Sequence, residues 1–148
     1  MDVLFYHLER APLERVLPDL LQKSLQKGWR AIVEVDPVER AEALDTMLWT
    51  FSDESFLPHG KGGDARAAEQ PVLLSNDPEN INKADIRFFI DGGDVTAHSG
   101  YQRLVYMFNG HDEEVVAKAR TQWKQASDAN LDVTYWQQNA AGAWEKRA

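Results

Sequence analysis

The strongest constraint on this chain is the way its apolar residues alternate between two spacings. Short runs with the period of a strand occur at residues 3–8, 31–35, 71–75, 86–90, 103–108 and 132–137. Between them, residues 12–28, 36–48 and 113–126 carry apolar side chains at the spacing of a helix. Such alternation predicts an α/β three-layer sandwich with a mostly parallel central sheet.

Local signals refine the expected elements. Pro18 lies inside the first helical segment and predicts a kink or a break there. Asp36 and Pro37 form a strong helix start, with a capping side chain followed by proline at the first helical position. Residues 59–70 are rich in glycine and charge and predict a loop. We expect one domain over residues 1–138, followed by a polar, flexible tail at 139–148.

Composition narrows the functional classes. The 148 residues suffice for one domain with a substantial core. No apolar run is long enough to cross a bilayer, no secretory signal is visible, and there are no cysteines, so a cytoplasmic location without membrane contact is expected. The net charge of −8 opposes direct attraction to nucleic acid.

Nucleotide binding is the first possibility that an α/β sandwich raises. A phosphate site needs glycines in the first turn between strand and helix, but Glu9-Arg10-Ala11-Pro12 contains none. The Gly60-Lys61-Gly62-Gly63 loop lacks the upstream glycine and the hydroxyl residue of a P-loop. The four histidines do not have metal-ligand spacing. We therefore expect no catalytic site, no cofactor and no metal.

Aromatic side chains cluster directly after the second helical segment. Trp49, Phe51 and Phe56 lie in a stretch that ends at Pro58 and runs into the Gly-rich loop. Exposed aromatics of this kind mark a contact surface. The same spacing also fits rings that fold back as the lid of the core, so both interpretations stay open.

In the last helical segment, the acidic residues come first and the basic residues follow. Asp112, Glu113 and Glu114 stand at its start, whereas its cations come later. This order complements the helix dipole, which explains it without any binding role. The alternative is a cationic rim around an apolar patch, since Val116 and Trp123 are neighbours of Arg120 on the helix.

Four segments together resemble one known family. These are Leu4-Phe5-Tyr6-His7-Leu8, Trp29-Arg30-Ala31-Ile32-Val33, the helix from Ala41 to Trp49, and Ser55-Phe56-Leu57-Pro58-His59. They resemble the chi subunit of bacterial DNA polymerase III, and the resemblance extends over roughly residues 1–137. It implies a fold similar to nucleotide-binding Rossmann-like domains.

The resemblance also implies two binding surfaces. Trp49 and Phe56 match residues at the surface that receives the psi subunit of the clamp loader or, alternatively, a helicase. Phe51 and Leu57 would form the rim of this surface or the core beneath it.

The last helix is where this family docks the C-terminal tail of single-stranded DNA-binding protein, which ends in Asp-x-Pro-Phe. Such a tail requires a guanidinium for its carboxylate and a pocket for its ring. By position, Arg120 takes the main cationic role, Lys124 supports it, and Trp123 packs or walls the pocket. Val116 stands where well-studied members carry a lysine, and Lys118 is the nearby cation on a different face.

The implied function is that of a non-catalytic accessory subunit in DNA replication. It would link the clamp loader to single-stranded DNA-binding protein, touch DNA only indirectly, and associate with the bacterial nucleoid through the replisome. One alternative is a repair adaptor that docks a helicase through the same surface. The other is a nucleotide-binding, Rossmann-like enzyme.

Overall fold

The computed structural model describes residues 2–9, 12–35, 43–48, 60–61, 67–75, 77–90 and 92–147. The strands are β1 (Asp2–Leu8), β2 (Ala31–Glu34), β3 (Gly60–Lys61), β4 (Val72–Ser75), β5 (Ile86–Phe89), β6 (Arg103–Asn109), β7 (Asp132–Gln138) and β8 (Trp144–Lys146). The helices are α1 (Leu13–Gln26), α3 (Glu113–Asp128), a helical segment at 43–48, and the 3-10 turns η1 (Ala67–Glu69) and η2 (Val95–Ala97). None of the described helices is long and apolar enough to span a bilayer.

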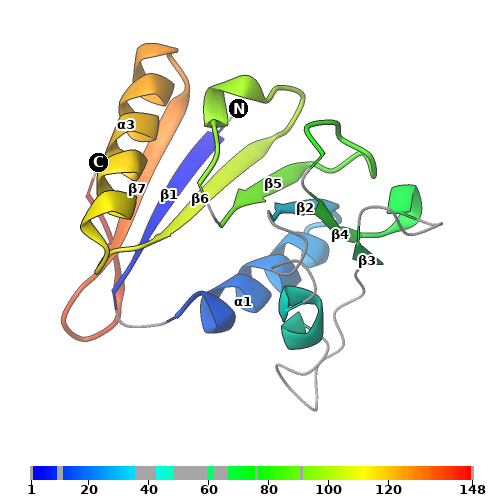
Figure 1. The fold of residues 1–148 in the computed structure, drawn as a ribbon, viewed down its shortest axis with the longest axis horizontal. Coiled ribbons are helices and arrows are strands. Elements are labelled where there is room, and N and C mark those ends of the chain that lie inside the picture. Colours follow the sequence, from blue (N-terminus) through cyan, green and yellow to red (C-terminus); the bar gives the residue numbers. More distant parts are fainter. Residues whose placement is uncertain are drawn as a thin grey trace.

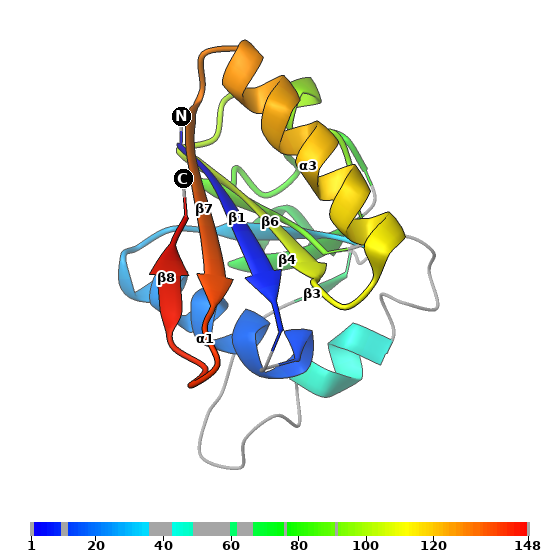
Figure 2. The same ribbon diagram turned by 90° about the vertical axis from the view of Figure 1, so that its left-hand side faces the viewer.

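The described strands form one sheet in the order β3-β4-β2-β5-β6-β1-β7-β8. All neighbouring pairs are parallel except β7 and β8. α1 and α3 lie on opposite sides of the sheet, as Figure 1 and Figure 2 show. The predicted three-layer α/β sandwich with a mostly parallel sheet is therefore confirmed.

Each helix layer seals its own core. On one face, Leu17 and Leu21 of α1 pack with Leu44, Leu48 and the inward side chains of the central strands. On the other face, Ala119 and Ala126 of α3 pack over a second apolar cluster beneath that helix. Because both faces are covered, the central strands β4 and β5 are buried along their whole length.

α1 continues through Pro18 from Leu13 to Gln26, although the sequence predicts a kink or a break at this proline. Pro18 itself is buried, together with Val16, Leu17 and Leu21. Burial of this apolar face against the sheet outweighs the backbone hydrogen bond that proline removes, because packing supplies most of a helix's stability in a protein.

Residues 139–148, expected to form a flexible tail, contain a strand. Trp144–Lys146 pairs with β7 in antiparallel register, and the Trp144 ring meets Tyr6 edge-on at 5.1 Å between centroids. Asn139 closes the connecting turn by accepting hydrogen bonds from the backbone N–H groups of Ala141 and Ala143. A single tryptophan thus anchors a polar segment whose composition alone indicates a tail.

The helix start predicted at Asp36-Pro37 lies outside the described residues, as does most of the predicted 59–70 loop. Within that loop, the structure describes the short edge strand β3 and the turn η1.

Candidate functional site

The candidate site lies on α3, which crosses from β6 to β7 over β1. The Asp112 side chain caps its first turn by accepting hydrogen bonds from the backbone N–H groups of Glu114 and Val115. Val115, Val116 and Trp123 pack against the sheet beside the buried alanines of the helix. This packing fixes the rotation of α3 about its axis and so determines which side chains face which strand.

The cations of α3 point to two different flanks. Residues two apart on an α-helix point about 160° away from each other, which separates Lys118 from Arg120. Lys118 lines a pocket that α1 borders on its opposite side, and the neighbouring Gln122 accepts a hydrogen bond from the backbone N–H of Val95. Arg120 is exposed on the flank that faces β1 and β7.

The structure therefore brings together most of the residues that the sequence places in the tail site. Four of these side chains lie on the β7 side of α3 or on the helix face next to it, namely Val116, Arg120, Trp123 and Lys124. Lys118 lies on the opposite side of the helix. Val116 and Trp123 are partly buried in packing, and Lys124 is exposed. Among the described residues, the buried Nε1 of Trp123 has no hydrogen-bond partner.

The Arg120 charge acts on two side chains that the sequence analysis did not single out. Burial raises the pKa of Tyr135, and the Arg120 charge opposes this shift. Burial also lowers the pKa of His7, and here the Arg120 charge acts in the same direction, while the Glu9 carboxylate acts against it. The Arg120 charge thus acts on both rings, that of His7 near the carboxyl end of β1 and that of Tyr135 in the middle of β7.

These rings belong to a polar cluster, defined by His7, Glu9, His111, Tyr135 and Gln137. His7 Nδ1 lies 2.6 Å from the Tyr135 hydroxyl, and His7 Nε2 lies 3.1 Å from Glu9 Oε1. Gln137 Nε2 donates to the same Glu9 oxygen at 2.8 Å, and His111 Nε2 donates to the Glu9 carbonyl at 2.7 Å. The cluster holds Tyr135 in a fixed position on the Arg120 flank of α3.

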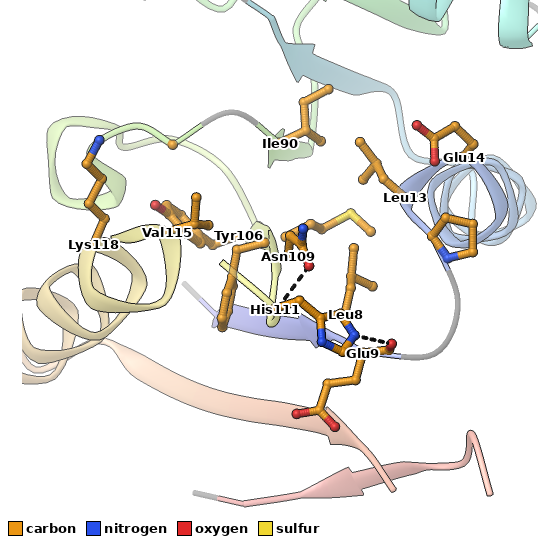
Figure 3. A pocket seen from close by; sticks show the side chains of 14 residues that line it. Leu8, Glu9, Leu13, Glu14, Ile90, Tyr106, Asn109, His111, Val115 and Lys118 are labelled. Atoms are coloured by element: carbon orange, nitrogen blue, oxygen red, sulfur yellow. Dashed lines mark hydrogen bonds between the residues drawn. The ribbon is translucent and has the colours of Figure 1, made fainter. Parts of the chain in front are cut away.

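A pocket of about 630 Å³ opens at the carboxyl ends of β1, β5 and β6, where α/β sheets commonly bind ligands. Figure 3 shows Leu13 and Glu14 on the α1 side, Val115 and Lys118 on the α3 side, and Glu9 beside His111 at the end of β1. The first turn of α1 begins at Pro12, which has no N–H, and carries the Glu14 carboxylate. A phosphate at this helix start would meet a negative charge and a missing donor, so the start of α1 does not offer the usual phosphate site of a nucleotide-binding fold.

The described residues contain no group of three side chains suited to hold a metal ion. The aromatic surface predicted from Trp49, Phe51, Phe56 and Leu57 lies outside the described residues. The helical segment at 43–48 that precedes it is described, with Leu44 and Leu48 in the core.

The fold and the candidate site together define an α/β protein with Rossmann-like layers. Its first helix starts with a proline and a carboxylate, and an exposed arginine lies on its last helix. Residues 1–134 match the family model described as DNA polymerase III chi subunit, HolC. The chain therefore belongs to the DNA polymerase III chi subunit family, which connects it with DNA replication.

A curated relative is the "Probable DNA polymerase III subunit chi" of Rickettsia prowazekii (strain Madrid E). The two chains are 27% identical over 90 residues, which cover 61% of this chain and 54% of the relative. The aligned part thus spans about half the length of that curated relative.

Proposed function

We propose that this chain is a non-catalytic accessory subunit of the DNA polymerase III holoenzyme. In this role it links the clamp loader to single-stranded DNA-binding protein, and it acts on DNA only through these partners. Family membership supports the polymerase complex as the setting. The net charge of −8 supports recruitment by protein contacts rather than by bare DNA.

The observation that carries the proposal is the exposed Arg120 on α3, on the same flank of the helix as Val116 and Lys124. A peptide that ends in phenylalanine offers a carboxylate and an apolar ring. A guanidinium can bind the carboxylate through two parallel N–H donors. Val116 and the Tyr135 ring supply apolar surface next to it, and Lys124 adds a second exposed cation one helical turn away.

Arg120→Ala is expected to weaken binding of a synthetic tail peptide ending in Asp-x-Pro-Phe by about 1.5 kcal/mol or more, the scale of a charge-assisted hydrogen bond. Isothermal titration calorimetry measures this directly. Lys83→Ala is the control, because it removes an exposed charge outside α3. Lys118→Ala tests whether the peptide binds on the Arg120 flank of α3. The proposed site is contradicted if Lys118→Ala loses as much affinity as Arg120→Ala, or if Arg120→Ala leaves the affinity unchanged.

Trp49 and Phe56 are proposed as the second docking surface, for a psi-like clamp-loader subunit, with Phe51 and Leu57 as supporting side chains. The basis is the family resemblance of this segment. A helicase docked at the same surface is the alternative partner, and it would make the chain a repair adaptor.

Trp49→Ala and Phe56→Ala are each expected to weaken capture of the partner from native cell extract at least about tenfold, as for interface anchors. Tail-peptide affinity should stay within about 0.5 kcal/mol, because distant sites act independently. Thermal melting of both variants is the control. If the rings are lids of the core instead, both melting temperatures fall steeply and both binding activities are lost.

A further inference from the structure

A second hollow surface lies on the sheet face opposite α3. Two adjoining cavities, of about 500 and 200 Å³, run along α1 where it borders the sheet. They share Tyr6, Leu20 and Lys23, so they form one continuous hollow, called here the α1 groove. The larger cavity is bounded by Trp136 of β7 and Trp144 of β8, and the smaller one by Trp29 and Arg103.

The α1 groove is open because of where α1 sits. The helix packs mainly on β2 and β6, whereas the sheet continues past β1 to β7 and β8. Figure 2 shows β7 and β8 extending the sheet beyond β1, with α1 on one side of it. Tyr6, Trp136 and Trp144 are only partly buried at the border between α1 and these strands.

The smaller cavity joins an apolar floor to a cationic rim. Side chains of the central strands and α1 form the floor, namely Leu4, Leu20, Ile86, Phe88 and Val105. Apart from the Tyr6 phenol, the ionisable side chains among the described lining residues are all cations: Lys23, Lys27 and Arg103. On a protein with a net charge of −8, three convergent cations are a local exception that favours an acidic ligand.

The ion pairs that these cations already form leave them able to bind a ligand carboxylate. Lys23 pairs with Asp19 at 3.1 Å, but both side chains are more than 60% exposed. Arg103 reaches Asp2 only at 3.6 Å, and its buried Nε has no hydrogen-bond partner among the described residues. The Lys23–Asp19 pair is exposed and contributes little to stability, so a ligand carboxylate can replace Asp19 at small cost.

Trp29 organises the rim. The Lys27 ammonium lies 4.8 Å from the Trp29 ring centre, and the Arg103 guanidinium carbon lies 5.2 Å from it. Both cations are therefore already held above the ring by cation–π attraction. The Tyr6 ring is likewise engaged, edge-on, by Trp144. Rings occupied in this way are poor platforms for stacking bases, which argues against single-stranded nucleic acid as the ligand.

We propose that the α1 groove binds an acidic segment of a partner protein. The segment inserts a leucine or phenylalanine side chain between α1 and β1, and its carboxylates face Lys23, Lys27 and Arg103. Trp136 and Trp144 border the larger cavity from residues beyond the 1–134 range that matches the family model. This surface is separate from Arg120, which lies across the sheet, and it does not depend on the function proposed above.

Tryptophan indole N–H signals of the ¹⁵N-labelled full chain provide the test. The probe is a synthetic peptide of aspartate and glutamate flanking one leucine and one phenylalanine, with an amidated C-terminus so that it lacks the terminal carboxylate of the tail. We expect saturable shifts of the Trp29 and Trp144 signals, while Trp123 on α3 stays unchanged. Shifts confined to Trp123, or no shifts at millimolar peptide, overturn the proposal.

Two charge reversals serve as controls for each other. Lys27→Glu is expected to weaken binding of the acidic probe about two- to fivefold, the scale of an exposed charge contact, and to leave binding of the tail peptide unaffected. Arg120→Glu is expected to weaken binding of the tail peptide and to leave binding of the acidic probe unaffected. Arg103→Gln provides a second groove variant. If Lys27→Glu abolishes binding of both peptides, the two sites are not separate. If only Arg120→Glu fails to give its expected result, only the tail site is contradicted.

Other occupants give distinct results. A version of the probe with lysine in place of its acidic residues should not bind, and equal binding would refute the role of charge. Tighter binding of oligothymidylate than of the acidic probe would assign the α1 groove to nucleic acid and overturn the proposal. Concentration-dependent shifts of the Trp29 and Trp144 signals without any probe, together with dimer sedimentation, would assign it to a second copy of the chain.

Discussion

Glu34→Ala is expected to lower the free energy of unfolding by about 3 kcal/mol, because it leaves a buried arginine without its counter-charge. The Arg87 side chain is fully buried, and its Nη2 donates to Glu34 Oε1 at 2.7 Å. Arg87 also donates to two neutral groups, the Asp77 carbonyl at 2.9 Å and the Tyr101 hydroxyl at 3.1 Å, while its buried Nε has no hydrogen-bond partner among the described residues. The Glu34 side chain is 21% exposed, which sets the expected cost at the low end of the range for buried pairs.

Urea unfolding of three variants isolates this effect. Glu34→Gln keeps an oxygen acceptor for Arg87 but removes the charge, so it should cost less than Glu34→Ala. In an Arg87→Met variant, Glu34 has no buried cation to balance, so adding Glu34→Ala to it should cost little. The double-mutant cycle should therefore show strong coupling. A cost below about 1 kcal/mol for Glu34→Ala, the scale of a surface pair, would mean that Arg87 is compensated in another way.

The elements of the fold could be predicted from sequence because the apolar period is local. The strand predicted at 103–108 is β6, and the helix predicted at 113–126 is α3, each within two residues of its observed ends. β3 and β8 could not be predicted in this way, because a strand of two or three residues has no period to recognise. β8 depends instead on contacts between distant parts of the chain and on its neighbour strand, namely its pairing with β7 and the packing of Trp144 against Tyr6.

Only the part of the candidate site that lies on α3 could be predicted, because helix geometry places its side chains. Arg120 and Lys124 share a flank because they are one turn apart on α3. Tyr135 joins them only because β7 pairs with β1, which sets Tyr135 beside Phe5 and so within reach of His7. Strand order is a property of the whole sheet. For the same reason, the Glu34–Arg87 pair follows from β2 lying next to β5 and from no local pattern.

Gly110→Ala is expected to destabilise the protein by about 2 kcal/mol, the usual cost of forcing an extra carbon into a packed site. A Cβ at Gly110 would overlap the His7 imidazole and lie 3.0 Å from the Leu8 carbonyl oxygen. That carbonyl accepts a hydrogen bond from the Gly110 N–H at 2.8 Å, and β1 is held between β6 and β7, so the backbone cannot yield. The His7 ring is therefore the group that must move.

Movement of His7 breaks its contact with the Tyr135 hydroxyl. Gly110→Ala should therefore also weaken binding of the tail peptide, although residue 110 lies outside the proposed peptide contact. Gly100→Ala is the matched control, because its Cβ would meet open space and only its positive φ of 86° opposes the change. His7→Ala supplies the decisive comparison. With the imidazole gone, adding Gly110→Ala should cost far less than it does in the wild type. Full additivity of the two changes in urea unfolding would show that the imidazole is not what excludes a side chain at position 110.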